Sequence, residues 1–83
     1  MSLDRDQVMT KVREHLAAEL EVGAGEIEAQ TRFREDLDAD SLDLYELVME
    51  LEDRYGVAVS EQQAAEIETV GDAVSFVLEH ATA

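Results

Sequence analysis

The sequence contains no cysteine, so neither a disulfide framework nor a cysteine-ligated metal centre can hold the fold. It also contains no proline, and no repeat or low-complexity tract interrupts it. No apolar run approaches the length of a membrane span, so we expect no insertion into a membrane. Packing of apolar side chains, which make up 46% of the chain, must therefore supply most of the stability.

Basic residues are scarce. Six Lys and Arg stand against 21 Asp and Glu, which gives a formal net charge of -15. This charge disfavours nucleic acid as a partner and attracts basic protein surfaces. No Lys or Arg occurs between Arg34 and Arg54, where acids are dense. Such a run is usually a solvated face, so the charge alone does not identify a function.

A chain of 83 residues has room for one small core. We therefore expect a single domain over residues 1–83, with residues 1–3 and 81–83 frayed. A deep catalytic cleft is not expected in so small a domain. The N-terminal residues lack the charged and apolar blocks of a secretory signal, which predicts a cytoplasmic protein.

Four helices are predicted from capping signals and apolar spacing. They are expected at residues 4–21, 41–55, 60–67 and from 69 onward. Capping-box spacing is found in three pairs, Asp4 with Gln7, Ser60 with Gln63, and Thr69 with Asp72. Gly23 and Gly25 are expected to stop the first helix.

Residues 22–40 show no sustained period and are predicted to form a long ordered loop, pinned by Ile27, Phe33 and Leu37, with a short turn near Phe33. So long a loop in a small domain is usually functional. The apolar residues 57–59 have no partner strand and are predicted to be a linker. The predicted fold is all-α, a small four-helix bundle with a long loop between helices 1 and 2 and a short third helix.

The second predicted helix carries two apolar stripes. At about 100° per residue, the inward stripe comprises Leu44, Leu47, Val48, Leu51 and Tyr55. The other stripe lies roughly 130° away and comprises Leu42, Tyr45 and Met49. An exposed apolar stripe bordered by acids fits a transient protein-docking surface. Two structural explanations of this second stripe are also possible. The helix could be buried on both sides, or the ring of Tyr45 could shield the edge of the core.

The segment DLDADSLDLYEL, residues 36–47, has the acid spacing of a calcium loop. Asp36, Asp38 and Asp40 match the first ligand positions of an EF-hand. However, Ser41 stands where the loop needs glycine, and Leu47 stands where it needs a bidentate Glu. No dedicated metal site is predicted.

A nucleophilic enzyme would need a base beside Ser41. The only histidines, His15 and His80, lie in the two terminal helices and are expected on the surface, and no glycines of a nucleophile elbow surround the serine. We therefore expect no catalytic activity. A structural interpretation is that Asp40 or Ser41 caps the second helix, with Asp43 near the box position. A cap alone explains neither the second stripe nor the long loop.

The residues EDLDADSLDLYELVMELEDRYG resemble the phosphopantetheine attachment region of acyl carrier proteins, in which Asp-Ser-Leu begins the second helix. The upstream EIEAQTRFREDL and the downstream AEIETVGDAVSFV are similar to that family's loop and to its third and fourth helices. The resemblance implies that Ser41 carries 4'-phosphopantetheine, transferred from coenzyme A by a phosphopantetheinyl transferase. It also implies that Asp40 assists this modification.

By the same resemblance, the chain shuttles thioester-linked acyl intermediates between enzymes of fatty-acid or polyketide synthesis. The implied partners are the transferase, acyltransferases, ketosynthases and other synthase enzymes with basic docking patches, and we expect the carrier to be a monomer. The stripe and the resemblance together assign docking to Leu42, Tyr45, Glu46, Met49, Glu52 and Asp53. The resemblance implies an acyl-chain cavity lined by Phe33, Leu51, Val59, Ala64, Ile67 and Ala73.

The chain departs from the family at Asp38, where many members have glycine, and at Leu44 and Tyr45, where small or β-branched residues are common.

A helix N-terminus favours a phosphate by roughly 0.3–1 kcal/mol, and one carboxylate about 6 Å away opposes it by roughly 0.7 kcal/mol. We therefore expect Asp40 and Asp43 to leave the phosphate loosely held.

Two other functions stay open at the level of the sequence. One is an acidic, calcium-responsive interaction module that uses Asp36, Asp38 and Asp40. The other is a carrier-like adaptor that binds partners without ever being modified.

Overall fold

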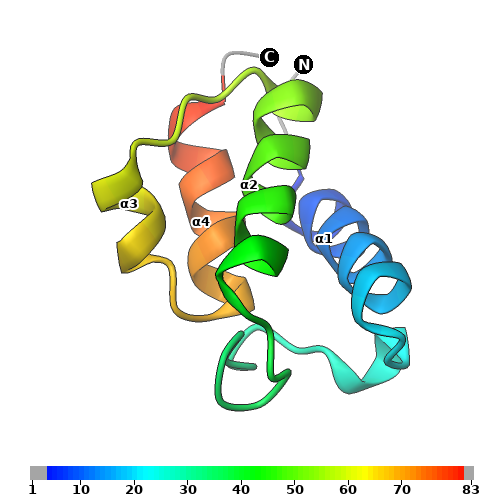
Figure 1. Ribbon diagram of the computed structural model, residues 1–83. Coiled ribbons are helices and arrows are strands. Elements are labelled where there is room, and N and C mark those ends of the chain that lie inside the picture. The colour runs from blue at the N-terminus through cyan, green and yellow to red at the C-terminus, as the bar shows by residue number, and fades with distance from the viewer. Residues whose placement is uncertain (1–3, 82–83) are drawn as a thin grey trace.

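The computed structural model describes residues 4–81 and consists of helices joined by loops (Figure 1). In that range lie α1 (Arg5–Leu20), the 3-10 helix η1 (Ala24–Glu26), α2 (Ser41–Tyr55), α3 (Glu61–Glu66) and α4 (Val70–His80). The predicted all-α bundle, with its long loop and short third helix, is confirmed, although η1 was not predicted. Within the described range, no helix is both long and apolar enough to cross a membrane. The fraying predicted at both ends lies outside the described residues, except at Ala81.

The helix ends follow the capping signals closely. The boxes predicted before α3 and α4 are confirmed, in Ser60 with Gln63 and Thr69 with Asp72. Asp4 caps α1, but its side chain accepts from the amide of Asp6, so the predicted box with Gln7 was wrong. Helix α1 ends before the glycines, because Glu21 itself adopts the left-handed conformation with φ 56°.

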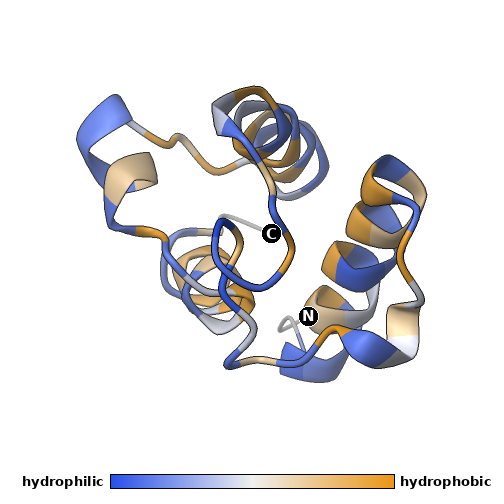
Figure 2. Cartoon of the chain, turned by 60° about the horizontal axis from the view of Figure 1, so that its bottom comes forward, coloured by the Kyte–Doolittle hydropathy of each residue, from blue (hydrophilic) through white to orange (hydrophobic). Residues whose placement is uncertain are grey.

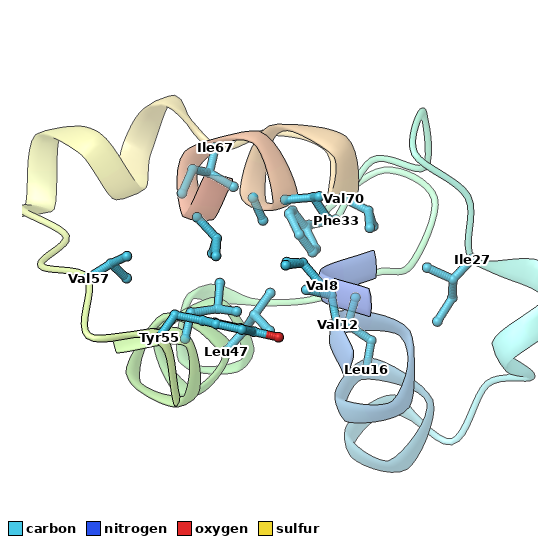
Figure 3. Close-up of a cluster of buried hydrophobic side chains, with 14 of the residues drawn as sticks. Val8, Val12, Leu16, Ile27, Phe33, Leu47, Tyr55, Val57, Ile67 and Val70 are labelled. Carbon is cyan, nitrogen blue, oxygen red and sulfur yellow. The ribbon is translucent and has the colours of Figure 1, made fainter. Parts of the chain in front are cut away.

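The core lies between α1, α2 and α4, and α1 packs mainly against α4. Figure 3 shows side chains from the helices and from the long loop pointing into one interior. The buried helical residues are Val8, Val12, Leu16, Leu47, Leu51, Tyr55, Val70, Ala73, Val74 and Val77. Complete burial of a Val or Leu side chain stabilises by about 1.5–3 kcal/mol.

Helices α2 and α3 are less completely buried than expected for members of a four-helix bundle. Of the predicted inward stripe of α2, Leu44 and Val48 are only half-buried, whereas the other three members are buried. Helix α3 has no buried residue and is mostly hydrophilic, in contrast to the apolar α4 (Figure 2). The linker over residues 57–59 contains no strand, as predicted. Since α3 has few buried contacts, we expect it to be the least stable helix.

All three residues predicted to pin the long loop pack in or against the core. Ile27 and Phe33 are fully buried, while Leu37 is half-buried. The Nε of Arg13 donates to the carbonyl of Ile27 at 2.8 Å, which ties the loop to α1. A turn over residues 33–36 confirms the turn predicted near Phe33.

Backbone hydrogen bonds join the loop to the start of α4. They run from Phe33 N to Glu68 O at 3.0 Å, from Val70 N to Thr31 O at 2.9 Å and from Gly71 N to Ala29 O at 2.8 Å. These bonds hold residues 29–33 beside the start of α4, and the chain then continues through the turn over residues 33–36 to the start of α2.

Gly71→Ala tests this junction. A Cβ at Gly71 would lie 2.9 Å from the carbonyl oxygen of Ala29, so the two backbones would have to separate. We expect a loss of about 1–3 kcal/mol in the free energy of unfolding, measured by thermal or urea denaturation. Gly25→Ala is the matched control, because nothing lies within 4 Å of its Cβ. Equal stability of the two variants would contradict the proposed role of the junction.

Candidate functional site

The start of α2 is closed by two aspartates that cap each other's backbone. Asp40 Oδ1 accepts from the amide of Asp43 at 2.9 Å, and Asp43 Oδ2 accepts from the amide of Asp40 at 3.1 Å. The N-cap is therefore Asp40, and Ser41 is the first helical residue. Ser41 is exposed, and its side chain takes no part in the cap. Its hydroxyl is free for chemistry that does not disturb the helix.

Arg34 approaches the same hydroxyl from the turn over residues 33–36. Its Nη2 donates to Ser41 Oγ at 3.2 Å. The sequence analysis missed this contact, because a separation of seven residues has no local pattern. An exposed hydroxyl beside a cationic donor is well suited to carry a phosphodiester, whose charge a guanidinium can pair.

The backbone conformation at Asp38 is one that glycine adopts easily, and in the family that this chain resembles glycine is common at this position. Asp38 has φ 56°, which lies in the left-handed region that glycine adopts without strain. Asp tolerates this region better than most residues do. The next residue, Ala39, is buried, and its amide donates to the carbonyl of Phe33 at 2.9 Å. The tight bend at Asp38 thus brings the chain back to the start of α2.

The aspartates of the calcium hypothesis do not converge on one point. Asp36 accepts from the backbone amide of Arg32 at 2.9 Å and from its guanidinium at 3.2 and 3.3 Å. The side-chain hydrogen bond from Arg32 is the main reason that the pKa of Asp36 is lowered. Asp40 is engaged in the cap. Among the described residues, no three-ligand group is formed with Asp38.

The second apolar stripe of α2 faces solvent. Leu42 is 63% exposed, Tyr45 61% and Met49 46%, which excludes burial of the helix on both sides. We call these three residues the docking stripe. The acids beside it differ in environment. Asp53 is exposed, whereas Glu46 is half-buried. Glu52 is also half-buried, and its carboxylate accepts from the amide of Val59 at 3.0 Å, so it has a structural role in the linker to α3.

A cavity of about 270 Å³ opens between the loop turn, α2 and α3. Its lining includes Arg34, Leu44, Ala64, Ala65, Ile67 and Glu68. Of the six residues predicted to line an acyl-chain cavity, Ala64 and Ile67 line this one. The other four lie elsewhere, with Phe33, Leu51 and Ala73 buried in the core and Val59 half-buried.

The two histidines do not supply a base to Ser41. His80 is exposed and its ring lies against Phe76, with 4.3 Å between the centroids. His15 is half-buried, and its Nε2 is enclosed without a hydrogen-bond partner in the described part of the chain. The prediction that His15 is a surface residue was therefore wrong.

Comparison with known proteins agrees with this geometry. A family model described as a phosphopantetheine attachment site matches residues 10–77. This chain belongs to the acyl carrier protein family. An acyl carrier protein of Rubrobacter xylanophilus is 46% identical over 98% of this chain and all of the relative. One from Lactobacillus acidophilus is 38% identical over 94% of this chain and 98% of the relative.

A solved structure of the acyl carrier protein from Enterococcus faecalis superposes with a TM-score of 0.82 at 34% identity, covering 95% of this chain and all of that one. Members of the family hold 4'-phosphopantetheine covalently and are carriers that interact with transferases and synthase enzymes. The resemblance noted in the sequence is therefore confirmed.

The carrier has an acidic contact between α1 and α2. One carboxylate oxygen from each of Glu19, Asp43 and Glu46 lies within 4.8 Å of the others. A side-chain hydrogen bond with Glu19, followed by repulsion from its charge, raises the pKa of Glu46 above the ordinary 4.5. Asp40 adds to the rise and His15 opposes it. The carboxyl of Glu46 thus holds its proton more readily in the folded chain than in the unfolded chain.

Because folding raises this pKa, the pair stabilises the fold fully below the ordinary pKa of Glu46, and the contribution is lost as pH rises through the raised value. We expect wild type to lose stability relative to Glu46→Gln as the pH rises from the ordinary pKa of 4.5 through the raised value. Denaturation of the two proteins across that range measures the difference. Glu19→Gln should remove the same pH dependence of stability, and combining Glu19→Gln with Glu46→Gln should not change that dependence further. A difference that does not change with pH would contradict the raised pKa of Glu46.

Proposed function

We propose that Ser41 bears the 4'-phosphopantetheine of this carrier, transferred from coenzyme A by a phosphopantetheinyl transferase. The group supplies a terminal thiol, which the cysteine-free chain itself lacks, and acyl intermediates of fatty-acid or polyketide synthesis are held on it as thioesters. The observation that carries the proposal is the exposed hydroxyl at the first residue of α2, outside the aspartate cap.

Asp40 assists the modification in this proposal. Only Oδ1 of Asp40 accepts a hydrogen bond within residues 4–81, and the side chain is exposed. The second oxygen is therefore available to a metal ion that the transferase holds beside the phosphate. Carboxylate oxygens are ligands that Mg²⁺ prefers.

The docking stripe and its acids are the proposed surface for transferases, ketosynthases and acyltransferases with basic patches. The stripe begins one residue after Ser41 and continues along the same helix, so a bound partner lies close to the arm. Exposed Met and Tyr side chains suit transient contacts with several partners. The acids steer a basic patch toward the stripe, although Glu52 also serves the fold.

The cavity at α3 is the proposed entrance for an acyl chain. Ala64 and Ile67 line it already. The buried Phe33, Leu51 and Ala73, with the half-buried Val59, lie in the interior that it would join on expansion. Helix α3, which buries no residue, can shift at little cost in packing. We further propose that residues 1–83 act as one cytoplasmic, monomeric domain.

Ser41→Ala tests the attachment site. Incubation of wild type with coenzyme A, Mg²⁺ and a broad-specificity phosphopantetheinyl transferase should add one phosphopantetheine mass, measured on the intact protein. The variant should gain none, and its stability should stay within about 0.5 kcal/mol of wild type because the cap is intact.

Ser60→Ala is the matched control, since Ser60 also stands at a helix start but serves as the N-cap of α3. It should remain fully modifiable while losing about 0.5–2 kcal/mol. An unchanged mass of folded wild type, or modification that survives Ser41→Ala, would overturn the proposal.

Met49→Ala tests the docking stripe. Because Met49 is 46% exposed, its truncation should leave thermal stability nearly unchanged while slowing acyl transfer from a partner enzyme. Met9→Ala is the matched control, since Met9 packs against the core from α1 and should lower stability without affecting docking. Rates of transfer and melting temperatures measure both effects. The opposite pattern, with Met49→Ala losing stability but no rate, would mean that the stripe is structural.

A further inference from the structure

We infer that Arg34 binds the phosphate of the attached arm and holds the root of the arm against the turn over residues 33–36. The inference rests on the proposed modification of Ser41. It assigns a role in holding the arm to Arg34, which lies outside the Asp-Ser-Leu attachment motif. The carrying observation is the hydrogen bond from Arg34 Nη2 to Ser41 Oγ at 3.2 Å.

Arg34 differs from Arg32 and Arg54, the nearest arginines before and after it in the sequence, in forming no ion pair among the described residues. Arg32 forms ion pairs with Glu35 and Asp36, and Arg54 pairs with Glu50. Across residues 4–81, Arg34 forms no ion pair within 4.0 Å, although acids are dense in this part of the sequence. Its guanidinium is directed instead at the one hydroxyl that is proposed to gain a negative charge.

The chemistry of modification strengthens this contact. Once Ser41 Oγ becomes an ester oxygen, the negative charge lies on the two non-bridging oxygens of the phosphate, two bonds beyond Oγ. A guanidinium already 3.2 Å from Oγ reaches these oxygens with only a small side-chain adjustment, and its planar fork can donate to both of them. A hydrogen bond from the charged guanidinium to a neutral hydroxyl is thereby replaced by an ion pair between opposite charges.

The nearby acids do not compete effectively for Arg34. Asp40 and Asp43 direct one carboxylate oxygen each at the other's backbone amide. Glu35 pairs with Arg32. Glu68, which lines the same cavity as Arg34, forms no ion pair with it among the described residues. The expectation that Asp40 and Asp43 leave the phosphate loosely held took no account of Arg34, whose guanidinium lies beside Ser41 Oγ.

The contact also gives the arm a direction. Arg34 lines the cavity between the loop turn, α2 and α3. A phosphate held by Arg34 starts the arm on that side of Ser41, toward the proposed entrance for the acyl chain. Because Arg34 is exposed, the pair favours the held state only about 1.4- to 5-fold. An enzyme that takes up the arm can therefore break it readily.

The test uses the modified carrier and follows the phosphate directly. In wild type, conversion from unmodified to modified protein should shift the Nε–H resonance of Arg34. The ³¹P resonance of Arg34→Gln should change in shift and narrow relative to wild type, because the phosphate moves more freely. Arg34→Lys, which keeps the charge but loses the fork, should fall between the two. High salt should bring the wild-type signal toward that of Arg34→Gln.

Arg54→Gln is the matched control, since it removes the same charge from the far end of α2 and should leave the ³¹P signal as in wild type. An unshifted Arg34 resonance in wild type, or identical ³¹P signals in wild type and Arg34→Gln, would overturn the inference. Intact mass separates this outcome from failure of the proposed function. A carrier that gains the phosphopantetheine mass with no Arg34 effect retains its function, whereas one that gains no mass loses both.

Discussion

The reciprocal cap between Asp40 and Asp43 is the interaction on which the functional end of the molecule depends. It satisfies backbone donors at both ends of the first turn of α2 with two carboxylates, at 2.9 and 3.1 Å. The helix can therefore begin at Ser41 without using the serine hydroxyl. The same cap turns one oxygen of each carboxylate toward a backbone amide at the helix N-terminus, where negative charge is stabilising. Asp40 and Asp43 thus stabilise the helix start at which the prosthetic group is proposed to attach.

The two sides of the site differ in how firmly they are held, and the difference suits a carrier. On one side, the loop is fixed by the buried Ile27 and Phe33 and by backbone bonds to the start of α4. On the other side, α3 buries no residue and is attached mainly through its flanking segments. A rigid loop would keep the proposed attachment point constant for every partner enzyme, while a loosely packed helix beside the cavity would allow the proposed acyl-chain entrance to open.

Local signals were sufficient to predict the fold, because caps and apolar periods act over three or four residues. The bounds of α2 and α3 and the start of α4 were predicted closely, and the docking stripe was predicted as an exposed face. Contacts between distant segments could not be predicted in this way. The hydrogen bond from Arg34 to Ser41 depends on the turn of the loop, and the burial of His15 Nε2 depends on how the helices pack. The predicted capping box of Asp4 with Gln7 was wrong, because the side chain of Asp4 accepts its hydrogen bond from the amide of Asp6.

The central claim is that Ser41 is the point at which acyl cargo joins this protein, and its most direct test is fragmentation mass spectrometry of the carrier purified from its own host. The account predicts that the peptide containing Ser41 carries phosphopantetheine, in part with an acyl group on its thiol. Host protein that is entirely unmodified at Ser41, or that carries the group on another residue such as Ser60, would contradict the account.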